Sequence, residues 1–583
     1  MNRAFRAVLL VVSLSVLALP AAVGAKGDPS DQAEKKAQTT DVQILALNDF
    51  HGNLEPPTGS GGRIGALTNN QCIAPTCYLA GGVEYLATHV RDLEKTNPNS
   101  VFVSAGDLIG ATPLLSALFH DEPTIEAFNL MGLDFNGVGN HEFDEGVDEL
   151  LRMQHGGCHP VDGCQDGDGF EGADFGFLAA NVAYKDSGET IFPPYAIQHF
   201  QGVKVAFVGM TLEGTPSIVS PAGISHVNFF DEADSVNALV PILKRQNVET
   251  IIVLLHEGGS TTNSNGVGTV AAINQCNALS GALPPIVDRM DDEIDVVVTG
   301  HTNWAVNCVV DGKIVTGAAH QGRLVTDIDL TISRATKDVV SAKVNNHIVT
   351  RDVPGAGDLT ALVADYQTIA APIANRVIGS ISADILRAPN SAGESPLGDV
   401  IADAQLAATE AADRGDAVVA FMNPGGIRAD LLYASSPAGE GDGNVTYGEM
   451  FTVQPFGNSM VTMTLTGEQI ERLLEEQFAP CTLGSNRILQ VSEGFTYTWS
   501  AGGGTCDKVD PTTIEIGGVT VVPGNSYRVT VNSFLADGGD SFPILTEGTD
   551  RLGGEVDTDA LERYIATNSP VPPGPQNRIT RVP

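Results

Sequence analysis

Asp49-Phe50-His51-Gly52 follows a short, mostly apolar stretch, residues 42–47, and the junction between the two decides the fold of this chain. A run of this length that ends in polar residues predicts a buried strand. Asp49 and His51 come just after it, two residues apart, so both side chains can reach one ion at the strand end. Three more predicted strands end beside polar side chains: 101–104 before Asp107, 250–255 before His256, and 296–299 before His301.

Stretches with helical periodicity separate these strands. Residues 233–246 place Val236, Val240 and Leu243 on one face of a predicted helix. Strands that alternate with helices predict an α/β domain with a sheet core. Loops at the carboxyl ends of such strands converge on one crevice. We therefore expect the polar residues at the strand ends to form a single site.

A second unit is expected after a break near residues 350–375. Residues 351–357 interrupt the strand pattern, and a helix-like stretch, 359–374, follows. The chain then shows a predicted helix at 397–412, a strand at 417–421, and a helix that starts at the capping-box sequence Thr466-Gly467-Glu468-Gln469 and runs to Phe478. A length of 583 residues accommodates several domains at ~150 residues each.

The first 25 residues have the pattern of a secretory signal peptide. Arg3 and Arg6 precede an apolar run, 8–23, and Val23-Gly24-Ala25 supplies small residues for cleavage after Ala25. The run is short of the ~20 residues that a membrane span needs, so a retained anchor is less favoured. Residues 26–40 are polar and predict a disordered lead-in. We expect a secreted, periplasmic or cell-surface protein.

Eight cysteines fit an oxidising compartment. Sequence alone does not determine their connectivity, but neighbouring pairs favour four disulfides. A cysteine zinc site is disfavoured because the short pairs have no His at finger spacing. The expected pairs are Cys72–Cys77, Cys158–Cys164, Cys276–Cys308 and Cys481–Cys506.

The net charge limits the kinds of partner. The chain carries 71 acidic and 32 basic residues, a formal charge of −39. Surfaces that coat nucleic acid or bind anionic membranes need basic patches. We therefore expect no stable nucleic-acid or membrane partner, and the sequence leaves the oligomeric state open.

The side chains at the strand ends suit a pair of divalent cations. Two cations ~3.5–4 Å apart need a bridging ligand, for which a carboxylate such as Asp107 is suited. Oxygen and imidazole ligands without thiolate favour Zn, Mn, Co or Fe, with Mg or Ca less natural. The candidate metal ligands are Asp49, His51, Asp107, Asn140, His256, His301 and Asn303.

His141 and Asp144 form a candidate catalytic dyad. His141 follows Asn140 directly, so its ring is expected near the cations without binding them. Asp144 would orient the ring and favour its cationic form, which can offset phosphoryl charge or protonate a leaving oxygen. Other histidines, among them His89, His120 and His226, are expected to be ordinary surface or packing residues.

Taken together, these clusters resemble a known signature. Residues 49–52, 106–107, 139–144, His256 and 300–303 are similar to the calcineurin-like metallophosphoesterase motifs. Residues 397–404, 423–428, 455–458 and 532–542 resemble the C-terminal domain of 5′-nucleotidases. The resemblance covers about residues 42–582, both predicted units of the chain.

The resemblance implies a fold and a division of labour. It implies a four-layer αββα metallophosphoesterase sandwich followed by a separate α/β substrate-binding domain. The expected boundaries are 1–25 for the signal peptide, 26–40 for the lead-in, 41–350 for the dimetal domain, 351–376 for a linker and hinge helix, and 377–583 for the nucleoside-binding domain. The hinge would let the domains rotate and bring bound nucleotide to the cations.

The resemblance also implies the substrate contacts. Phe456 and Phe534 would stack on the base, which every base tolerates because each has a π-face. Asp540 would hold the ribose hydroxyls. The remaining implied polar contacts to the substrate are Asn423, Arg428 and Asn458.

Two features depart from the family pattern. Members often carry an Arg shortly before the Leu-Gly-Asp-type helix start, whereas residues 390–396 contain none and Arg387 is the nearest. Asn303 stands where some members have Gln or His, so a weaker first metal site is expected. The first departure leaves the preferred substrate open.

The function implied is removal of the 5′-phosphate from nucleoside monophosphates by attack of a metal-bound hydroxide. On the same site, a 2′,3′-cyclic nucleotide phosphodiesterase, a nucleotide-sugar pyrophosphatase or a nuclease remains an alternative. A sulfur-compound hydrolase is less favoured because it leaves the base-stacking residues without a role. A non-catalytic surface-binding protein is also less favoured because it would be expected to lose ligands or the dyad.

Overall fold

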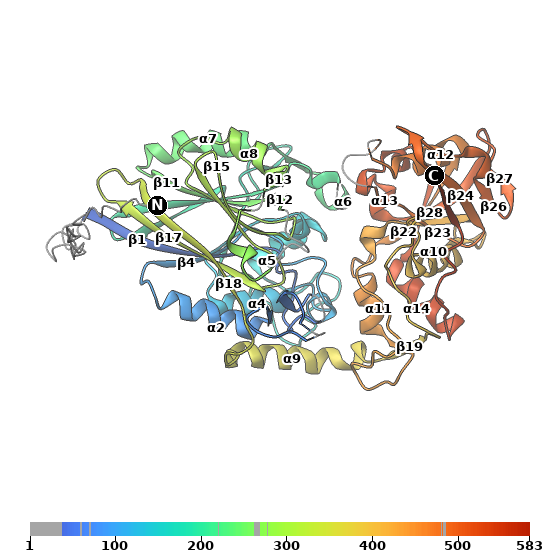
Figure 1. Ribbon diagram of the computed structural model, residues 1–583, viewed down its shortest axis with the longest axis horizontal. Helices are drawn as coiled ribbons and strands as arrows, with labels where there is room; N and C mark the ends of the chain where they lie inside the picture. The colour runs from blue at the N-terminus through green and yellow to red at the C-terminus, as the bar shows by residue number, and fades with distance from the viewer. Residues whose placement is uncertain are drawn as a thin grey trace, which may run out of the picture. The chain divides into compact units, whose positions relative to one another are not determined.

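The computed structural model describes residues 38–583 except 59–60, 69–70, 218, 220, 262–268, 277, 480 and 482–485. The predicted signal peptide and nearly all of the predicted lead-in lie outside the described residues. Figure 1 follows the chain from β1 (Thr39–Leu47) to β30 (Ile579–Val582). Among the described helices, none is long and apolar enough to cross a membrane.

Two six-stranded sheets, counted over the described residues, form the centre of the first half. The predicted strands are confirmed to within two or three residues at their ends, and β1 pairs in parallel with β4 in the register Ile44 to Val101. The first sheet has the order β18 (Val339–Ile348), β17 (Leu324–Ser333), β1, β4 (Ser100–Ser104), β5 (Phe135–Gly137), β6 (Gly176–Leu178). The second has the order β15 (Ala305–Val310), β16 (Lys313–Ala318), β14 (Val296–Thr299), β11 (Thr250–His256), β9 (Val203–Thr211), β8 (Tyr195–Phe200).

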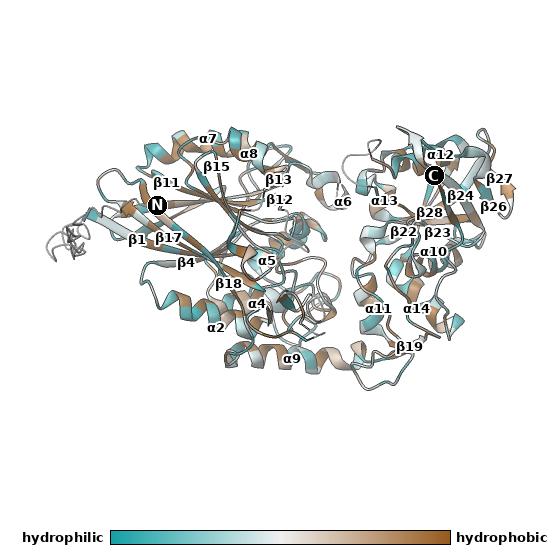
Figure 2. Ribbon diagram, in the orientation of Figure 1, coloured by the Kyte–Doolittle hydropathy of each residue, from teal (hydrophilic) through white to brown (hydrophobic). Residues whose placement is uncertain are grey.

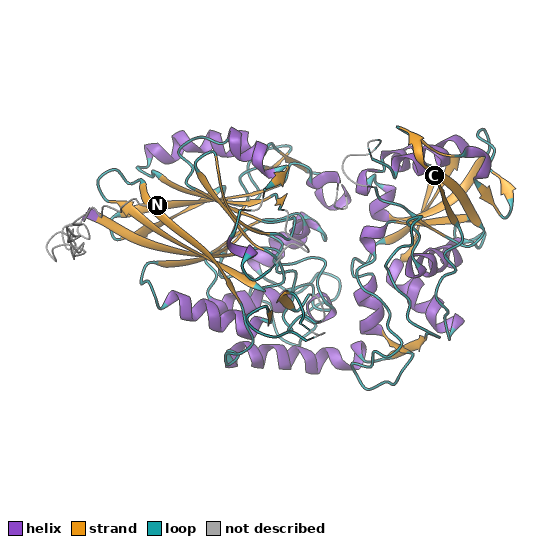
Figure 3. Ribbon diagram, in the orientation of Figure 1, coloured by secondary structure: helices purple, strands orange, loops and turns teal. Residues whose placement is uncertain are grey.

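Alternation of side chains along the strands produces four layers. On β1, Ile44 and Ala46 belong to the core between the sheets, whereas Leu45 and Leu47 belong to a second core beneath helices. This follows from the period of two along a strand, which sends successive side chains to opposite faces. Figure 3 shows helices on the outer sides of the paired sheets, among them α2 (Val83–Glu94), α4 (Glu122–Met131), α7 (Glu232–Arg245) and α8 (Leu283–Arg289). The αββα expectation is confirmed.

Local signals define the covering helix α7. The Asp231 carboxylate accepts from the Asp234 amide at its N-terminus, and basic residues occupy its last turn. The cap satisfies a free amide of the first turn, and both charged groups interact favourably with the helix dipole. The predicted inward face is confirmed, because Val236, Val240 and Leu243 are buried. Figure 2 shows hydrophilic and hydrophobic residues alternating along such helices.

Helix α9 (Gly357–Ala374) occupies the stretch predicted as a linker helix. Leu359, Tyr366 and Ala370 are buried in the core of the first half. The Tyr366 ring lies 4.8 Å from that of Phe119. Its hydroxyl donates to Glu126 over 3.0 Å. The helix is therefore anchored on the first half of the chain.

Among the described residues, the second half of the chain has its own hydrophobic core, which includes a five-stranded sheet. The predicted capping box is confirmed: Thr466 and Gln469 exchange side-chain to backbone hydrogen bonds at the start of α12 (Gly467–Glu476). The sheet has the order β23 (Gln490–Val491), β20 (Val419–Met422), β28 (Ser526–Asn532), β22 (Ser459–Thr466), β29 (Thr549–Val556). Other helices of this half are α10 (Pro396–Thr409), α11 (Tyr447–Val453), α13 (Ser533–Ala536) and α14 (Asp557–Asn568).

One predicted helix boundary is wrong. The pattern predicted a helix to residue 412, but α10 ends at Thr409. The Ala411 carbonyl instead accepts the amides of Arg414 and Asp416, which closes a turn. The chain then enters β20 two residues later than predicted.

The four expected disulfides are confirmed. They are Cys72–Cys77, Cys158–Cys164, Cys276–Cys308 and Cys481–Cys506. They fit the expected oxidising compartment.

Candidate functional site

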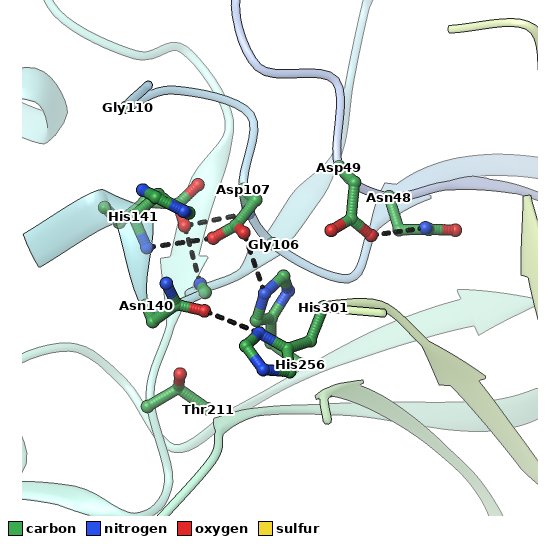
Figure 4. A network of polar contacts seen from close by, with 12 residues as sticks. Asn48, Asp49, Gly106, Asp107, Gly110, Asn140, His141, Thr211, His256 and His301 are labelled. Carbon is green, nitrogen blue, oxygen red and sulfur yellow. Dashed lines mark hydrogen bonds and ion pairs between the residues drawn. The ribbon is translucent and has the colours of Figure 1, made fainter. Parts of the chain in front are cut away.

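The predicted ligands lie at one end of the paired sheets. Asp49 follows β1, Asp107 follows β4, and Asn140 comes three residues after β5. His256 is the last residue of β11, and His301 comes two residues after β14. Figure 4 shows these side chains pointing toward one another from separate strand ends. The polar residues at these strand ends therefore meet at one place, as expected.

Asp107 is at the centre of this group. Its Oδ2 lies 2.9 Å from His256 Nε2 and 3.7 Å from His51 Nε2. Its Oδ1 accepts the His141 amide over 2.9 Å. Two sets of potential ligand atoms share this residue: His51, Asp107 and His141 in one, and Asp49, Asp107 and His256 in the other. A carboxylate shared by two sets is what a bridging ligand requires.

Hydrogen bonds to backbone carbonyls aim the imidazoles. His51 Nδ1 lies 2.9 Å from the Gly110 oxygen, and His256 Nδ1 lies 2.7 Å from the Ala105 oxygen. With Nδ1–H donating, each Nε2 keeps a lone pair for a cation. Within the described residues, the buried Asp49 Oδ1 has no hydrogen-bond partner, and His256 Nε2 faces the Asp107 carboxylate. Buried polar atoms normally find one, so these donors fit a pair of divalent cations.

Asn140 and His301 contact each other beside this group. His301 Nδ1 lies 2.9 Å from Asn140 Oδ1 (Figure 4). Asn303 lies in the same turn, and its amide donates to the His301 carbonyl over 3.2 Å. The described contacts link Asn303 to neither Asp49 nor His51. Its expected role in the first metal site stays a prediction.

Burial and charge set the protonation of the ligands. Burial raises the pKa of Asp107, but His256 and His141 outweigh it and hold the net pKa well below its usual range. Burial lowers the pKa of both His51 and His301 to about 4. Two ligands are exceptions. Burial raises the pKa of Asp49 to about 7. Burial lowers the pKa of His256, but Asp107 raises it more, to about 10. An ionised carboxylate and neutral imidazoles are the forms that bind metals.

His141 and Asp144 make the predicted contact. His141 opens the 3-10 turn η1 (His141–Phe143), and its Nδ1 lies 2.7 Å from Asp144 Oδ2. Burial lowers the His141 pKa, but Asp144 and Asp107 raise it more, to about 9. The ring lies 5.0 Å from the His51 ring, between centroids. The arrangement therefore provides an imidazolium beside the candidate metal ligands.

Glu142 is a structural member of the site to which the sequence analysis assigned no role. Its carboxylate accepts the amides of Asp107, Leu108 and Gly139 and the side chain of Asn136. It therefore clamps the loop after β4 against the loop after β5. Burial raises its pKa to about 7. Its position inside the 139–144 motif was the signal available for it.

Gly139 allows the close approach of the same two loops. A Cβ on this residue would lie 2.2 Å from Asp107 Oδ1 and 2.6 Å from the Asp107 nitrogen. No side chain fits at that distance. The glycine is therefore required for Asp107 to occupy its central position.

The predicted substrate residues share a cavity with the dyad. The cavity has a volume of about 300 Å³. It brings together residues more than 250 positions apart in the chain. From the first half it is lined by Asn140, His141, Asp144, Val219 and His301, and from the second half by Asn423, Gly425, Gly426, Arg428, Phe456, Asn458, Arg487, Asn532, Phe534 and Asp540.

Hydrogen bonds fix the polar end of this cavity. Asn423 Nδ2 donates to Asp540 Oδ2 over 2.7 Å, and Asn532 Nδ2 donates to Asn423 Oδ1 over 3.0 Å. Asn458 accepts from the Ser533 hydroxyl over 3.4 Å. The amide and carboxylate groups are thereby held in fixed orientations, as recognition of a polar ligand requires.

Arg428 and Phe456 lie at the junction with the dyad. The Arg428 guanidinium lies 5.6 Å from the Phe456 ring centroid, and that ring lies 6.3 Å from the His141 ring. Burial lowers the Arg428 pKa, and neighbouring Arg387 lowers it further. Arg387 donates to the Arg428 carbonyl over 2.8 Å. An Arg is thus present beside the predicted substrate contacts, although residues 390–396 contain none.

The cavity also contains residues that sequence reasoning missed. Asn532 directly precedes Ser533-Phe534, so the 532–542 motif carried a signal for it. Arg487 donates to the Asp540 carbonyl over 2.8 Å. It belongs to no motif, and only the fold brings it to the cavity.

Models of two protein families match the chain. The model described as calcineurin-like phosphoesterase matches residues 42–304. The model described as 5′-nucleotidase, C-terminal domain, matches residues 377–547. The two matches follow one another along the chain, in the order of the two sheet cores.

Relatives match across nearly the whole chain. Endonuclease YhcR of Bacillus subtilis is 32% identical over 543 residues, which cover 91% of this chain. The chain spans only 40% of the length of that relative. Cell wall protein Lmo0130 of Listeria monocytogenes is 30% identical over 571 residues, covering 91% of this chain and 68% of the relative.

A solved structure shares the fold. The crystal structure of a 5′-nucleotidase precursor from Thermus thermophilus superposes with a TM-score of 0.68. It covers 93% of this chain and 99% of the other, at 24% identity. At that identity the likeness concerns the two-part architecture.

Proposed function

The chain belongs to the 5′-nucleotidase family, and from this premise we propose that it removes the 5′-phosphate from nucleoside monophosphates. Membership supports a phosphohydrolase that uses divalent metal ions. The preferred nucleotide, the cations and the role of each residue are parts of the proposal.

One observation carries the proposal. The 300 Å³ cavity is lined both by the His141–Asp144 dyad and by Phe456, Phe534 and Asp540. Aromatic faces suit a base, and a carboxylate suits the hydroxyls of a ribose. The Phe456 ring lies 6.3 Å from the His141 ring, so a nucleoside stacked on Phe456 would lie beside the dyad. A simple phosphate ester has no base, so Phe456 and Phe534 would have no base to stack on.

Seven residues at the strand ends would hold two divalent cations. They are Asp49, His51, Asp107, Asn140, His256, His301 and Asn303. When bound, such cations supply a nucleophile at neutral pH and offset phosphoryl charge.

The remaining steps belong to the chain itself. His141, held as a cation by Asp144, would face the phosphoryl oxygens or protonate the leaving 5′ oxygen. Arg428 would bind the substrate phosphate by a charge-assisted hydrogen bond. The imidazole-rich ligand set favours Zn, Mn, Co or Fe over Mg or Ca.

A substrate panel tests the proposal. Phosphate release would be measured from AMP, UDP-glucose and 2′,3′-cyclic AMP, with p-nitrophenol release from bis(p-nitrophenyl) phosphate, on enzyme loaded with Mn²⁺ or Zn²⁺. Diester products would be coupled to a phosphatase. We expect AMP to be the fastest substrate and His141→Ala to lose at least 100-fold in kcat/KM. Activity confined to the diesters would overturn the proposal.

A nuclease or cyclic phosphodiesterase is the second candidate. The observation that favours it is the 32% identity to a relative named an endonuclease. Cleavage of a single-stranded oligonucleotide by the wild type, abolished in His141→Ala, would favour this candidate. Inactivity of metal-loaded enzyme on every substrate would instead favour a binding protein.

We also propose export and a hinge. The disulfides and a relative named a cell wall protein support a position outside the cytoplasmic membrane. N-terminal sequencing of the secreted protein tests cleavage after Ala25. The proposed hinge lies at 351–376, between the dimetal domain, 41–350, and the nucleoside-binding domain, 377–583.

A further inference from the structure

A second cluster of histidines and carboxylates lies outside the site described above. His120 follows the short helix α3 (Leu114–Ala117), and Glu145 follows the dyad residue Asp144. His159 and Asp162 lie in the loop that the Cys158–Cys164 disulfide closes. His120, expected to be an ordinary surface or packing residue, lies at the centre of this cluster.

The contacts within the cluster are close. His120 Nδ1 lies 3.0 Å from Glu145 Oε2, and His120 Nε2 lies 2.9 Å from Asp162 Oδ2. His159 Nδ1 lies 3.3 Å from the same Asp162 oxygen. The two imidazole rings stack, with centroids 3.7 Å apart and planes 13° apart. Two imidazoles thus share one carboxylate oxygen.

These separations are those of ligands around one cation. Bonds of ~2.0–2.2 Å to a tetrahedral ion place neighbouring ligand atoms roughly 3–3.5 Å apart. One potential ligand atom from each of His120, Glu145 and His159 lies within 4.8 Å of the others. Imidazole and carboxylate donors together suit Zn²⁺ better than Mg²⁺ or Ca²⁺.

A proton holds the same groups together when no cation is bound. Burial lowers the pKa of His120, but hydrogen bonds to Glu145 and Asp162 raise it more, to about 9. A divalent cation would displace this proton, as metals do at histidine sites. A cavity of about 70 Å³ is lined by His120 and Glu145, together with His141 and Asp144.

We propose that His120, Glu145 and His159, with Asp162 on the other ring nitrogen of His120, form a further site for one borderline divalent cation, Zn²⁺ above all. The site would be additional to the cations of the catalytic centre. Because Glu145 follows Asp144 directly, a cation here ties the dyad-bearing turn to the disulfide-closed loop. Its role would be to stabilise the position of that turn.

Zinc content tests the proposal. The full mature chain would be equilibrated with ZnCl₂, passed through a gel-filtration column, and analysed for zinc per chain by mass spectrometry. His159→Ala is expected to bind one equivalent less than the wild type. The matched control is His155→Ala, an exposed histidine near the same loop and outside the cluster, which is expected to keep the wild-type zinc content. Equal zinc in the wild type and His159→Ala would overturn the proposal.

A second measurement covers the case in which His159→Ala folds poorly. Asp162→Asn keeps the size of the side chain and removes the shared charged oxygen, and it is also expected to lose one zinc. Diffraction from wild-type crystals at the zinc edge should give an anomalous peak between His120, Glu145 and His159. Absence of that peak would show that ion pairs alone hold the cluster. Zinc content does not depend on phosphate release, so this test is independent of the proposed function.

Discussion

Gly139→Ala is expected to disable the proposed catalytic centre through steric contacts with Asp107. The added Cβ would lie 2.2 Å from Asp107 Oδ1 and 2.9 Å from Asp107 Cγ. Ordinary contacts between non-bonded atoms lie near ~3.5 Å, so the Asp107 carboxylate must move by more than about 1 Å. Gly139 does not have a positive φ, so alanine adds no backbone strain and the contact is the whole perturbation.

The expected loss of rate follows from the position of the displaced Asp107 carboxylate. Asp107 Oδ2 lies 2.9 Å from His256 Nε2, and both metal-binding sets contain Asp107. A displacement of 1 Å at a reacting centre costs about 100-fold in rate, or ~2.7 kcal/mol of transition-state stabilisation. Overpacking should also lower the free energy of unfolding by roughly 1–3 kcal/mol.

The assay compares three proteins. Metal content, kcat/KM on AMP and melting temperature would be measured for the wild type, Gly139→Ala and the control Gly169→Ala. A Cβ at Gly169 would meet no atom within 4 Å, so the control should behave as the wild type. If Gly139→Ala keeps full metal content and activity within about threefold of the wild type, the central position assigned to Asp107 is refuted.

Two further predictions concern the dyad and the cavity. In Asp144→Asn the His141 pKa should fall from about 9 toward its ordinary value of 6.5, although Asp107 still raises it. His141 is an imidazolium only below its pKa, so the alkaline limb of the kcat–pH profile should move to lower pH in this variant. At pH 8, kcat should fall about tenfold. An alkaline limb at the same pH as in the wild type would contradict the dyad. Phe534→Ala should raise KM for AMP roughly 5- to 150-fold, the equivalent of ~1–3 kcal/mol of stacking. Ribose 5-phosphate, which has no base, is the control substrate, and an equal loss on it would argue against stacking.

Short-range features of the site could be predicted from the sequence. The strand ends at Asp49, Asp107 and His256 follow from hydrophobic runs that stop at polar residues, and all three are at one end of the sheets. The contact between His141 and Asp144 is equally local, because a spacing of three on a helical turn brings two side chains together. For these residues the neighbours in the chain supply the geometry.

Long-range features could not be predicted in the same way. Glu142 accepts from Asp107 and Leu108, which lie 35 and 34 positions before it. Arg487 reaches the cavity from a stretch without a motif. The stacking of His120 on His159 depends on a loop that a disulfide closes.

The amino-acid sequence by itself determined the α/β class, the positions of the main strands and the motifs of the family. Each of these depends on periodicity, on neighbours in the chain or on short spacings. Only the tertiary structure decided that Asp107 is shared by two ligand sets, that the dyad and the aromatic residues line one cavity, and that a second histidine cluster exists. These depend on contacts between segments far apart in the chain, whose distances are set when the sheets and helices pack.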